Sequence, residues 1–291
     1  MEKNSSPAGT SGKQKVRSAE VGTDILKALA ELSPATSLSR LAEHVGMPAS
    51  KVHRYLQALI ASGFAVQDAS TNHYSLGREA LRVGLAALDS MDVLKSAAAP
   101  LAELRDVLNE TCFLAVWGNR GATVVQVEQA VRAVTVVTQV GSVLPLLGSS
   151  TGLVFAAFLP EREVAELREE ELAGRADHPL ADPAAYAVLL EGIRARGLHA
   201  IHGLLMPGVE ALSAPVFDAR GRVAAVLTVV GPASIFQAEE QGPAAERLLA
   251  TTRAISVGGW FFWRGGTGGV GWLEDRRGAG FRRQRVKYPA K

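Results

Sequence analysis

Hydrogen-bond donors line one side of a short segment of this chain, and no carboxylate stands among them. Apolar side chains recur at helical spacing between residues 52 and 60, so the polar side chains must project from the opposite face of a helix. Donors of these types bind phosphate oxygens and base edges, and Arg and Gln can pair bidentately with guanine and adenine. The pattern predicts a face that enters a DNA groove, made by Ser50, Lys51, His53, Arg54 and Gln57.

A helix-turn-helix would position this face. Leu38, Leu41 and Val45 recur at the spacing of a first helix. Gly46 can end that helix in a left-handed conformation, and Pro48 suits the start of the second helix. In this geometry the second helix lies in the major groove. The alternative, an ordinary two-helix corner with a solvated polar face, stays open for this segment taken alone.

A β-hairpin is expected directly after the second helix. Gly63 ends the helix, residues 64–68 and 73–76 have the composition of two strands, and residues 69–72 supply a polar turn. Together the elements predict a winged helix-turn-helix. We expect further DNA contacts at the start of the first helix and on the wing, from Ser37, Arg40, Asn72 and His73.

A second candidate site precedes an apolar helix near residue 152. Small residues at this point leave backbone N–H groups open at the helix N-terminus, where the helix dipole favours an anion. Ser149, Ser150 and Thr151 add hydroxyl donors, and Gly152 lets a ligand approach closely. The simpler interpretation is that Ser or Thr only caps the helix. The residues alone leave both interpretations open.

Composition favours two domains with well-formed cores. The chain has 291 residues, of which 47% are hydrophobic, and its single cysteine excludes an internal disulfide. The sequence holds no run of 18 apolar residues and no signal-peptide core, so we expect no membrane contact and a cytoplasmic protein. Charges sum to +3 over residues 1–82, −7 over 83–257 and +6 over 258–291. A mildly basic head on an acidic body fits a DNA-binding domain joined to one that need not touch DNA.

The patterns along the chain predict five segments. Residues 1–17 are expected to be a disordered arm, 18–78 the winged helix-turn-helix, 79–92 a linker helix, 93–257 an α+β domain around an antiparallel sheet, and 258–291 a flexible tail. Within the α+β domain we expect strands near residues 112–117, 123–129, 135–140, 211–217 and 223–230.

The linker helix carries apolar residues that recur at three or four positions, Leu81, Leu85 and Leu88. Such a stripe suits pairing with a second copy of the chain as easily as packing within one chain. We expect a homodimer.

Several motifs, taken in order along the chain, are together specific. They span residues 47–54 in the second helix of the pair, 74–77 at the end of the wing, 144–152, 208–218 and 229–232. With these motifs the chain resembles the isocitrate lyase regulator (IclR) family of bacterial transcription regulators over about residues 18–256. The resemblance implies a winged helix-turn-helix, a linker helix and a GAF-like effector-binding domain that forms dimers or dimers of dimers. It also implies double-stranded operator DNA as a partner, and control of metabolic operons for organic or aromatic acids.

The resemblance places an effector pocket beside residues 149–152. Carried over position by position, the opposite wall would consist of Ala211, Thr228 and Val230, with Ile201 or His202 on the preceding strand. Relatives that bind small keto acids have polar groups at several positions where this chain has Ile201, Ala211 and Val230. We therefore expect an effector with a carboxylate and an aromatic or alkyl body.

Two alternatives to a regulator are a sensor that acts through protein contacts and an enzyme of unknown reaction. Cys112 lies in an apolar run with no nearby His, which favours an inert buried thiol. His199 and His202 would point to opposite faces of a strand, which argues against a metal pair. We expect no catalytic residue, metal or cofactor.

The tail matches the dinucleotide fingerprint GxGxxG at residues 266–271. The match is treated as accidental because too few residues follow it for a strand-helix-strand unit. The basic tail is either an extension foreign to the family or a source of nonspecific DNA affinity.

Overall fold

The computed structural model describes residues 17–132, 135–175, 177–256, 262–264, 270–275 and 282–287. The chain divides into two compact units, residues 1–90 and 91–291. Of the predicted disordered arm, residues 1–17, the first 16 lie outside the described residues, and Arg17 is the first residue of a helix. No helix among the described residues is long and apolar enough to cross a membrane.

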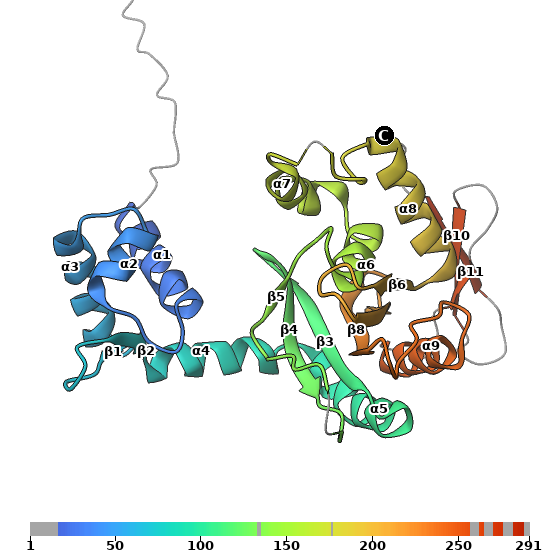
Figure 1. Ribbon diagram of the computed structural model, residues 1–291, viewed down its shortest axis with the longest axis horizontal. Helices are drawn as coiled ribbons and strands as arrows, with labels where there is room; N and C mark the ends of the chain where they lie inside the picture. Colours follow the sequence, from blue (N-terminus) through green and yellow to red (C-terminus); the bar gives the residue numbers. More distant parts are fainter. Residues whose placement is uncertain are drawn as a thin grey trace, which may run out of the picture. The chain divides into compact units, whose positions relative to one another are not determined.

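Three helices, a hairpin and a fourth helix form the first unit (Figure 1). They are α1 (Arg17–Glu31), α2 (Leu38–His44), α3 (Ala49–Ala61), β1 (Ala65–Gln67), β2 (Tyr74–Leu76) and α4 (Arg78–Asp89). The apolar faces of α1, α2 and α3 enclose a small core that includes Ile25, Leu41, Val52 and Leu56. The helix-turn-helix and its hairpin therefore have the predicted order, with strands somewhat shorter than expected.

A six-stranded antiparallel sheet is the framework of the second unit, in the order β5-β4-β3-β8-β7-β6. Its strands are β3 (Thr111–Gly118), β4 (Gly121–Glu128), β5 (Val143–Leu144), β6 (His199–His202), β7 (Val209–Phe217) and β8 (Val223–Pro232). Its helices are α5 (Asp92–Leu108), α6 (Ser150–Phe158), α7 (Glu161–Leu172), α8 (Pro183–Arg196) and α9 (Pro243–Ile255). The α+β class with an antiparallel sheet is confirmed.

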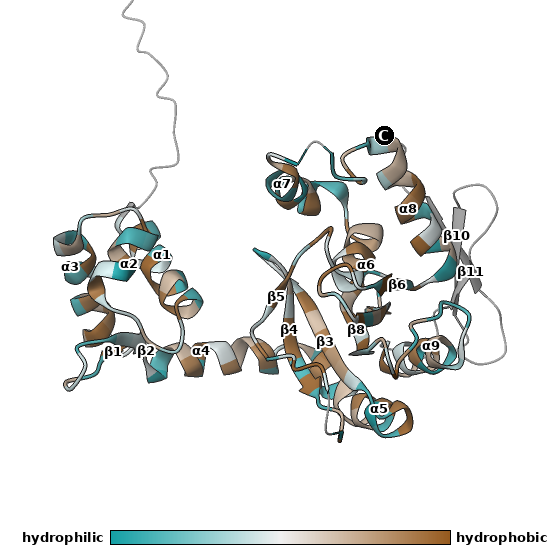
Figure 2. Cartoon of the chain, viewed as in Figure 1, coloured by the Kyte–Doolittle hydropathy of each residue, from teal (hydrophilic) through white to brown (hydrophobic). Residues whose placement is uncertain are grey.

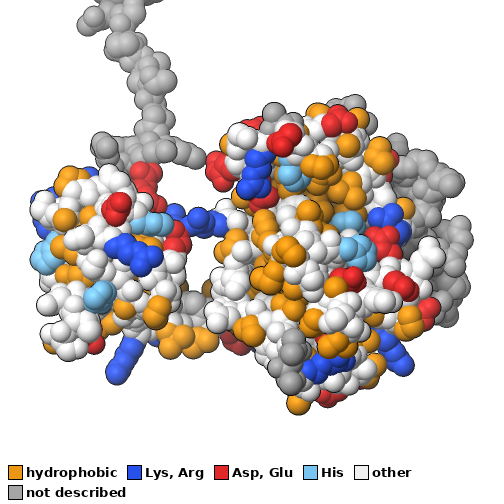
Figure 3. Space-filling view, in the orientation of Figure 1, with side chains coloured by type: hydrophobic (Ala, Val, Ile, Leu, Met, Phe, Trp, Pro, Cys, Tyr) orange, Lys and Arg blue, Asp and Glu red, His pale blue; other side chains and the backbone are white. Residues whose placement is uncertain are grey.

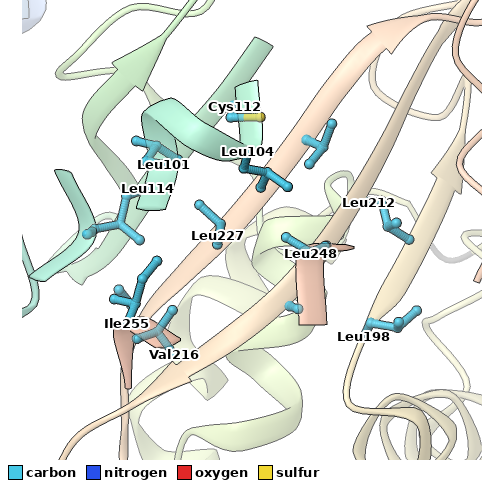
Figure 4. Packing of buried hydrophobic residues seen from close by; sticks show 14 of the residues in the cluster. Leu101, Leu104, Cys112, Leu114, Leu198, Leu212, Val216, Leu227, Leu248 and Ile255 are labelled. Carbon is cyan, nitrogen blue, oxygen red and sulfur yellow. The ribbon is translucent and has the colours of Figure 1, made fainter. Parts of the chain in front are cut away.

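Helices cover both faces of this sheet. Successive strand residues alternate between the faces, so Leu114 packs toward α5 and α9 while Phe113 packs toward α6. In Figure 4, the side chains of Leu101, Leu227 and Leu248 meet in the core on the α5 and α9 side. The other core takes residues from α6, α7 and α8, which Figure 1 shows on the opposite side of the sheet from α5 and α9. A polar side chain inside either core is therefore costly to bury unless it finds a hydrogen-bond partner there.

One predicted strand is wrong. The described residues within 135–140 form no strand, and the third strand of this region is β5 instead. The backbone of the segment is held by side chains where a ladder would use backbone groups. The Thr111 hydroxyl donates to the Val136 carbonyl at 3.1 Å, and the Gln129 amide donates to the Thr138 carbonyl at 2.8 Å.

The tail also differs from the prediction where it is described. It contains a three-stranded antiparallel sheet of β9 (Phe262–Arg264), β10 (Val270–Asp275) and β11 (Arg282–Lys287). Aromatic and β-branched residues favour strands, although Gly-rich neighbours hid that tendency in the sequence. Gly271, the last residue of the GxGxxG match, lies in β10 and pairs with Val286 rather than leading into a helix.

Candidate DNA interface and ligand-binding cluster

Helix α3 separates its apolar and polar side chains as the sequence predicts. Val52 and Leu56 are fully buried against α1 and α2. Four of the predicted DNA-contacting side chains, Ser50, His53, Arg54 and Gln57, are exposed, and Lys51 is half-buried. No carboxylate occurs on this helix, and Figure 3 shows Lys, Arg and His side chains over α2 and α3. The face is open to a nucleic acid, and its donors are unopposed by acidic groups within the helix.

Local backbone chemistry sets the angle at which α3 is presented. The Ser37 hydroxyl caps α2 by accepting from the Arg40 N–H at 3.3 Å. Gly46 follows α2 with φ of +62°, a left-handed conformation that glycine adopts without strain. Pro48 then stands as the N-cap of α3 with φ of −58°. Arg40 is exposed in the first turn of α2, whereas the Ser37 side chain is engaged in the cap.

An acidic residue organises the turn of the wing. The Asp68 carboxylate accepts hydrogen bonds from the Ser70 hydroxyl and from the N–H groups of Ser70 and Thr71, and these bonds lower the pKa of Asp68 to about 2. Asn72 has φ of +56° at the turn and is exposed, and His73 is half-buried. The carboxylate is thus occupied by its own turn, which leaves Asn72 at the tip.

Four buried hydroxyls meet where α6 begins above the sheet. Ser150 and Thr151 come from α6, Ser213 from β7 and Thr228 from β8, and each side chain is at most 2% exposed. The oxygens of Ser150 and Ser213 lie 2.7 Å apart, those of Ser213 and Thr228 2.8 Å, and those of Thr151 and Thr228 2.8 Å. We call these four residues the hydroxyl cluster. Its members satisfy one another, so a ligand that reaches the cluster must exchange hydrogen bonds with it.

The two residues that flank the start of α6 have structural roles. The Ser149 hydroxyl accepts from the Gly152 N–H at 2.9 Å and donates to the Pro145 carbonyl at 2.6 Å, so Ser149 caps the helix. Gly152 packs against the backbone of Pro145 and Leu146, where a Cβ atom would come closer than 3.0 Å to several backbone atoms. Close packing of α6 on the 145–147 segment therefore requires glycine.

The apolar wall predicted for the pocket lies two residues along the strands from the hydroxyl cluster, on the same face of the sheet. Ile201 pairs with Ala211 and Ala211 pairs with Val230, so the three side chains form a row on the α6 face of the sheet. His202, the alternative to Ile201, pairs with Glu210, and its side chain lies on the opposite face, 63% exposed. The structure therefore brings Ile201, Ala211, Thr228 and Val230 together and leaves His202 apart.

Sequence reasoning missed Ser213, the residue that joins both hydroxyls of α6 to the sheet. It stands two positions after Ala211, and strand alternation applied to Ala211 would have found it. By the same alternation His199 shares the face of Ile201 and pairs with Ser213 across the strands.

Both units match models of known protein families. The IclR helix-turn-helix domain matches residues 18–69, and the C-terminal domain of bacterial transcriptional regulator IclR matches residues 85–257. The second match alone covers more than half of the chain, and it ends where the tail begins.

Individual relatives agree with these matches. The crystal structure of Pseudomonas aeruginosa HmgR is 95% identical, covers 83% of this chain and 98% of its own, and superposes with a TM-score of 0.67. The HTH-type transcriptional regulator BhcR of Paracoccus denitrificans is 28% identical over 244 residues, covering 84% of this chain and 87% of the relative. An IclR homologue from Microbacterium hydrocarbonoxydans, solved in complex with 4-hydroxybenzoate, is 22% identical with a TM-score of 0.65, covers 81% of this chain and 97% of its own, and shows a shared fold.

The close packing of Gly152 predicts a large effect of one methyl group. Gly152→Ala should destabilise the second unit, because the 145–149 segment must move away from α6 to admit the new Cβ. Gly22→Ala, in helix α1, is the matched control, since the new Cβ would meet only a carbon of Tyr55, at 3.9 Å. The control should stabilise slightly, by about 0.5–1 kcal/mol. Thermal unfolding followed by calorimetry measures both, and equal unfolding temperatures for Gly152→Ala and the unmodified chain would contradict the packing argument.

Proposed function

The chain belongs to the IclR family of bacterial transcriptional regulators, and from this premise we propose which residues bind operator DNA and what kind of molecule controls the protein. The observation that carries the DNA-binding assignment is the exposed face of α3, which is free of carboxylates and backed by the buried Val52 and Leu56. As a regulator that binds chromosomal DNA, the protein would act in the cytoplasm.

The exposed face of α3 divides into base-reading and phosphate-binding side chains. Arg54 and Gln57 stand one helical turn apart and can pair with base edges in the major groove. The neighbouring side chains bind the phosphates of the DNA backbone and so position the helix; they are Ser50, Lys51 and His53. The Gln57 amide nitrogen lies 3.3 Å from a ring nitrogen of His53, so the two side chains stand side by side on this face. Arg40 and the wing residues Asn72 and His73 add phosphate contacts, and Ser37 contributes by capping α2.

Helix α4 supports a homodimer. None of its residues is buried. Its apolar stripe of Leu81, Leu85 and Leu88 is open to solvent, with Leu81 64% exposed and Leu85 55% exposed. Figure 2 shows hydrophobic residues along the length of this helix. An apolar stripe of this kind needs a partner, and a second α4 supplies a matching one in a two-fold arrangement. Such dimers, alone or in pairs, would place two α3 helices on one operator.

The ligand that we propose is a carboxylate with an aromatic or alkyl body. The hydroxyls of Ser150 and Thr151 stand at the N-terminus of α6, where the helix dipole favours an anion. Ile201, Ala211 and Val230 supply an apolar wall beside them. The complex of a family homologue with 4-hydroxybenzoate is in keeping with such a ligand. Control of an operon for organic or aromatic acids follows from this choice.

A catalytic function has less support. The curated relative BhcR is a transcriptional regulator. Burial raises the pKa of Cys112 to about 12, so its thiol is a poor nucleophile at neutral pH. His199 and His202 lie on opposite faces of β6. We therefore assign no residue a catalytic role, and we retain a sensor that acts through protein contacts as the second candidate, since α4 offers an exposed apolar surface.

The DNA assignment predicts the effect of shortening one side chain. Arg54→Ala should weaken binding to an operator fragment, selected from the genome with random competitor present, by about 1–3 kcal/mol, or roughly five- to 150-fold, because a base contact is lost. Lys27→Ala, an exposed lysine of α1, is the control and should bind nearly as the unmodified chain does. Equal loss on operator and random DNA would make Arg54 a phosphate contact, and no enriched fragment at all would favour the protein-contact sensor.

The ligand assignment predicts selectivity among acids. Calorimetry should show benzoate, 4-hydroxybenzoate or phenylacetate binding at least tenfold more tightly than acetate or pyruvate, because burial of a ring on the apolar wall contributes about 1.5–3 kcal/mol. Val230→Ser places a hydroxyl on that wall and should narrow the difference. Binding of the short acids alone would overturn the proposal.

The dimer assignment predicts that charged substitutions on α4 lower the mass of the assembly in solution. Leu81→Lys combined with Leu85→Lys should lower the mass measured by analytical ultracentrifugation, because two charged stripes repel. Val188→Lys, at a side chain of α8 that is 70% exposed, should leave the mass unchanged. A monomeric unmodified chain, or an unaltered mass in the double variant, would contradict pairing through α4.

A further inference from the structure

A histidine lies beside the hydroxyl cluster on the α6 face of the sheet. His199 on the edge strand β6 pairs with Ser213 on β7, so the two side chains leave the sheet on the same face. Directly opposed residues on one face have Cβ atoms about 4.5–5.5 Å apart. Ser213 is the member of the cluster that contacts Ser150, Thr151 and Thr228. His199 is therefore the titratable side chain that extends this row of hydroxyls to the edge of the sheet.

His199 is largely buried beside a carboxylate. Its side chain is 12% exposed, and Nδ1 is buried, makes no hydrogen bond within the described part of the chain, and lies 3.4 Å from Oε1 of Glu240. Glu240 is fixed in turn by Nε of Arg196 at 2.7 Å and by the Ala200 N–H at 3.3 Å. The carboxylate thus joins the segment before α9 to the end of α8 and to the edge of β6.

These groups set the protonation of the imidazole. Burial lowers the pKa of His199 below its ordinary value of 6.5, the Glu240 carboxylate raises it, and Arg196 and His202 lower it further. Ser150 and Thr151 of α6 and Ser213 of β7 carry no charge. In the absence of ligand the neutral imidazole therefore prevails at neutral pH.

We propose that His199 is a specificity-determining residue of the ligand site, and that its imidazole takes up a proton when an anionic effector binds at the hydroxyl cluster. The proposal rests on the ligand site put forward above. It adds a group that distinguishes a carboxylate from a neutral molecule of the same shape. The two kinds of group differ in selectivity. The hydroxyls and the helix N-terminus bind any hydrogen-bond acceptor, whereas an imidazolium favours a negative charge.

The direction of the pH effect follows from linkage. A carboxylate placed near the imidazole raises the pKa of His199 in the complex above its value in the free protein. Binding then takes up protons at pH values between the two, so affinity rises as pH falls through the pKa of the complex and levels off below that of the free protein. Each unit of difference corresponds to a tenfold change in affinity.

The test measures benzoate binding by calorimetry at pH 7.5 and pH 5.5, with benzamide as its neutral analogue. The unmodified chain should bind benzoate about tenfold more tightly at the lower pH, with proton uptake detected from buffers of different ionisation heat. His199→Gln should abolish the pH dependence and reduce the preference for benzoate over benzamide. His44→Gln is the control, because it changes a histidine of helix α2 in the first unit, outside the ligand site and the DNA-contacting set, and should behave like the unmodified chain.

A second variant keeps the test informative should His199→Gln fail to fold. Glu240→Gln leaves the imidazole in place and removes the charge that raises its pKa, so the rise in benzoate affinity should move to lower pH. Benzoate that binds with equal affinity at both pH values, or with an unchanged pH dependence in the variants, would overturn the role of His199 and leave the ligand class standing. Failure of benzoate, 4-hydroxybenzoate and phenylacetate to bind at either pH would overturn both.

Discussion

Burying a hydroxyl group without a hydrogen-bond partner is costly where helices cover both faces of a sheet, and this constraint organises the α6 side of the second unit. Ser213 and Thr228 point into the core beneath α6, where both side chains are shielded from solvent. Isolated burial of each hydroxyl would cost about 1–3 kcal/mol, and the two hydroxyls avoid this cost by bonding to each other and to residues of α6. Ser150 and Thr151 provide these bonds at the first turn of the helix, where open N–H groups also lie. The constraint that fixes α6 on the sheet thus also gathers donors at one point.

The DNA-binding unit obeys a different rule, since its functional face is local in sequence. The faces of α3 follow from helical periodicity alone, with Val52 and Leu56 buried and Arg54 exposed between them. The turn at Gly46 is equally local. Sequence therefore predicts this surface well, because no distant residue decides which way a side chain on α3 points.

The ligand site could be predicted only in part, because its partners are remote along the chain. Ser150 and Ser213 are 63 residues apart, and only strand pairing with the correct register brings them together. The resemblance to relatives predicts Thr228 and the apolar row but not Ser213. Only the alternation of side chains along β7 places Ser213 on the same face as Ala211. The strand predicted at residues 135–140 is wrong for a related reason, because strand-like composition does not specify a pairing partner. The Thr111 hydroxyl, rather than a neighbouring strand, bonds to the Val136 carbonyl.

The same alternation separates two histidines that the sequence presents as a pair. His199 and His202 stand three residues apart on β6, so one shares the face of Ser213 while the other shares the face of Glu210. Each has a carboxylate within 3.5 Å, yet only His199 is shielded from water. An interaction with a charge is stronger where solvent does not screen it, so a ligand anion has more influence on His199 than on its neighbour. Position on a face, rather than residue type or spacing, therefore decides which histidine can report on the ligand.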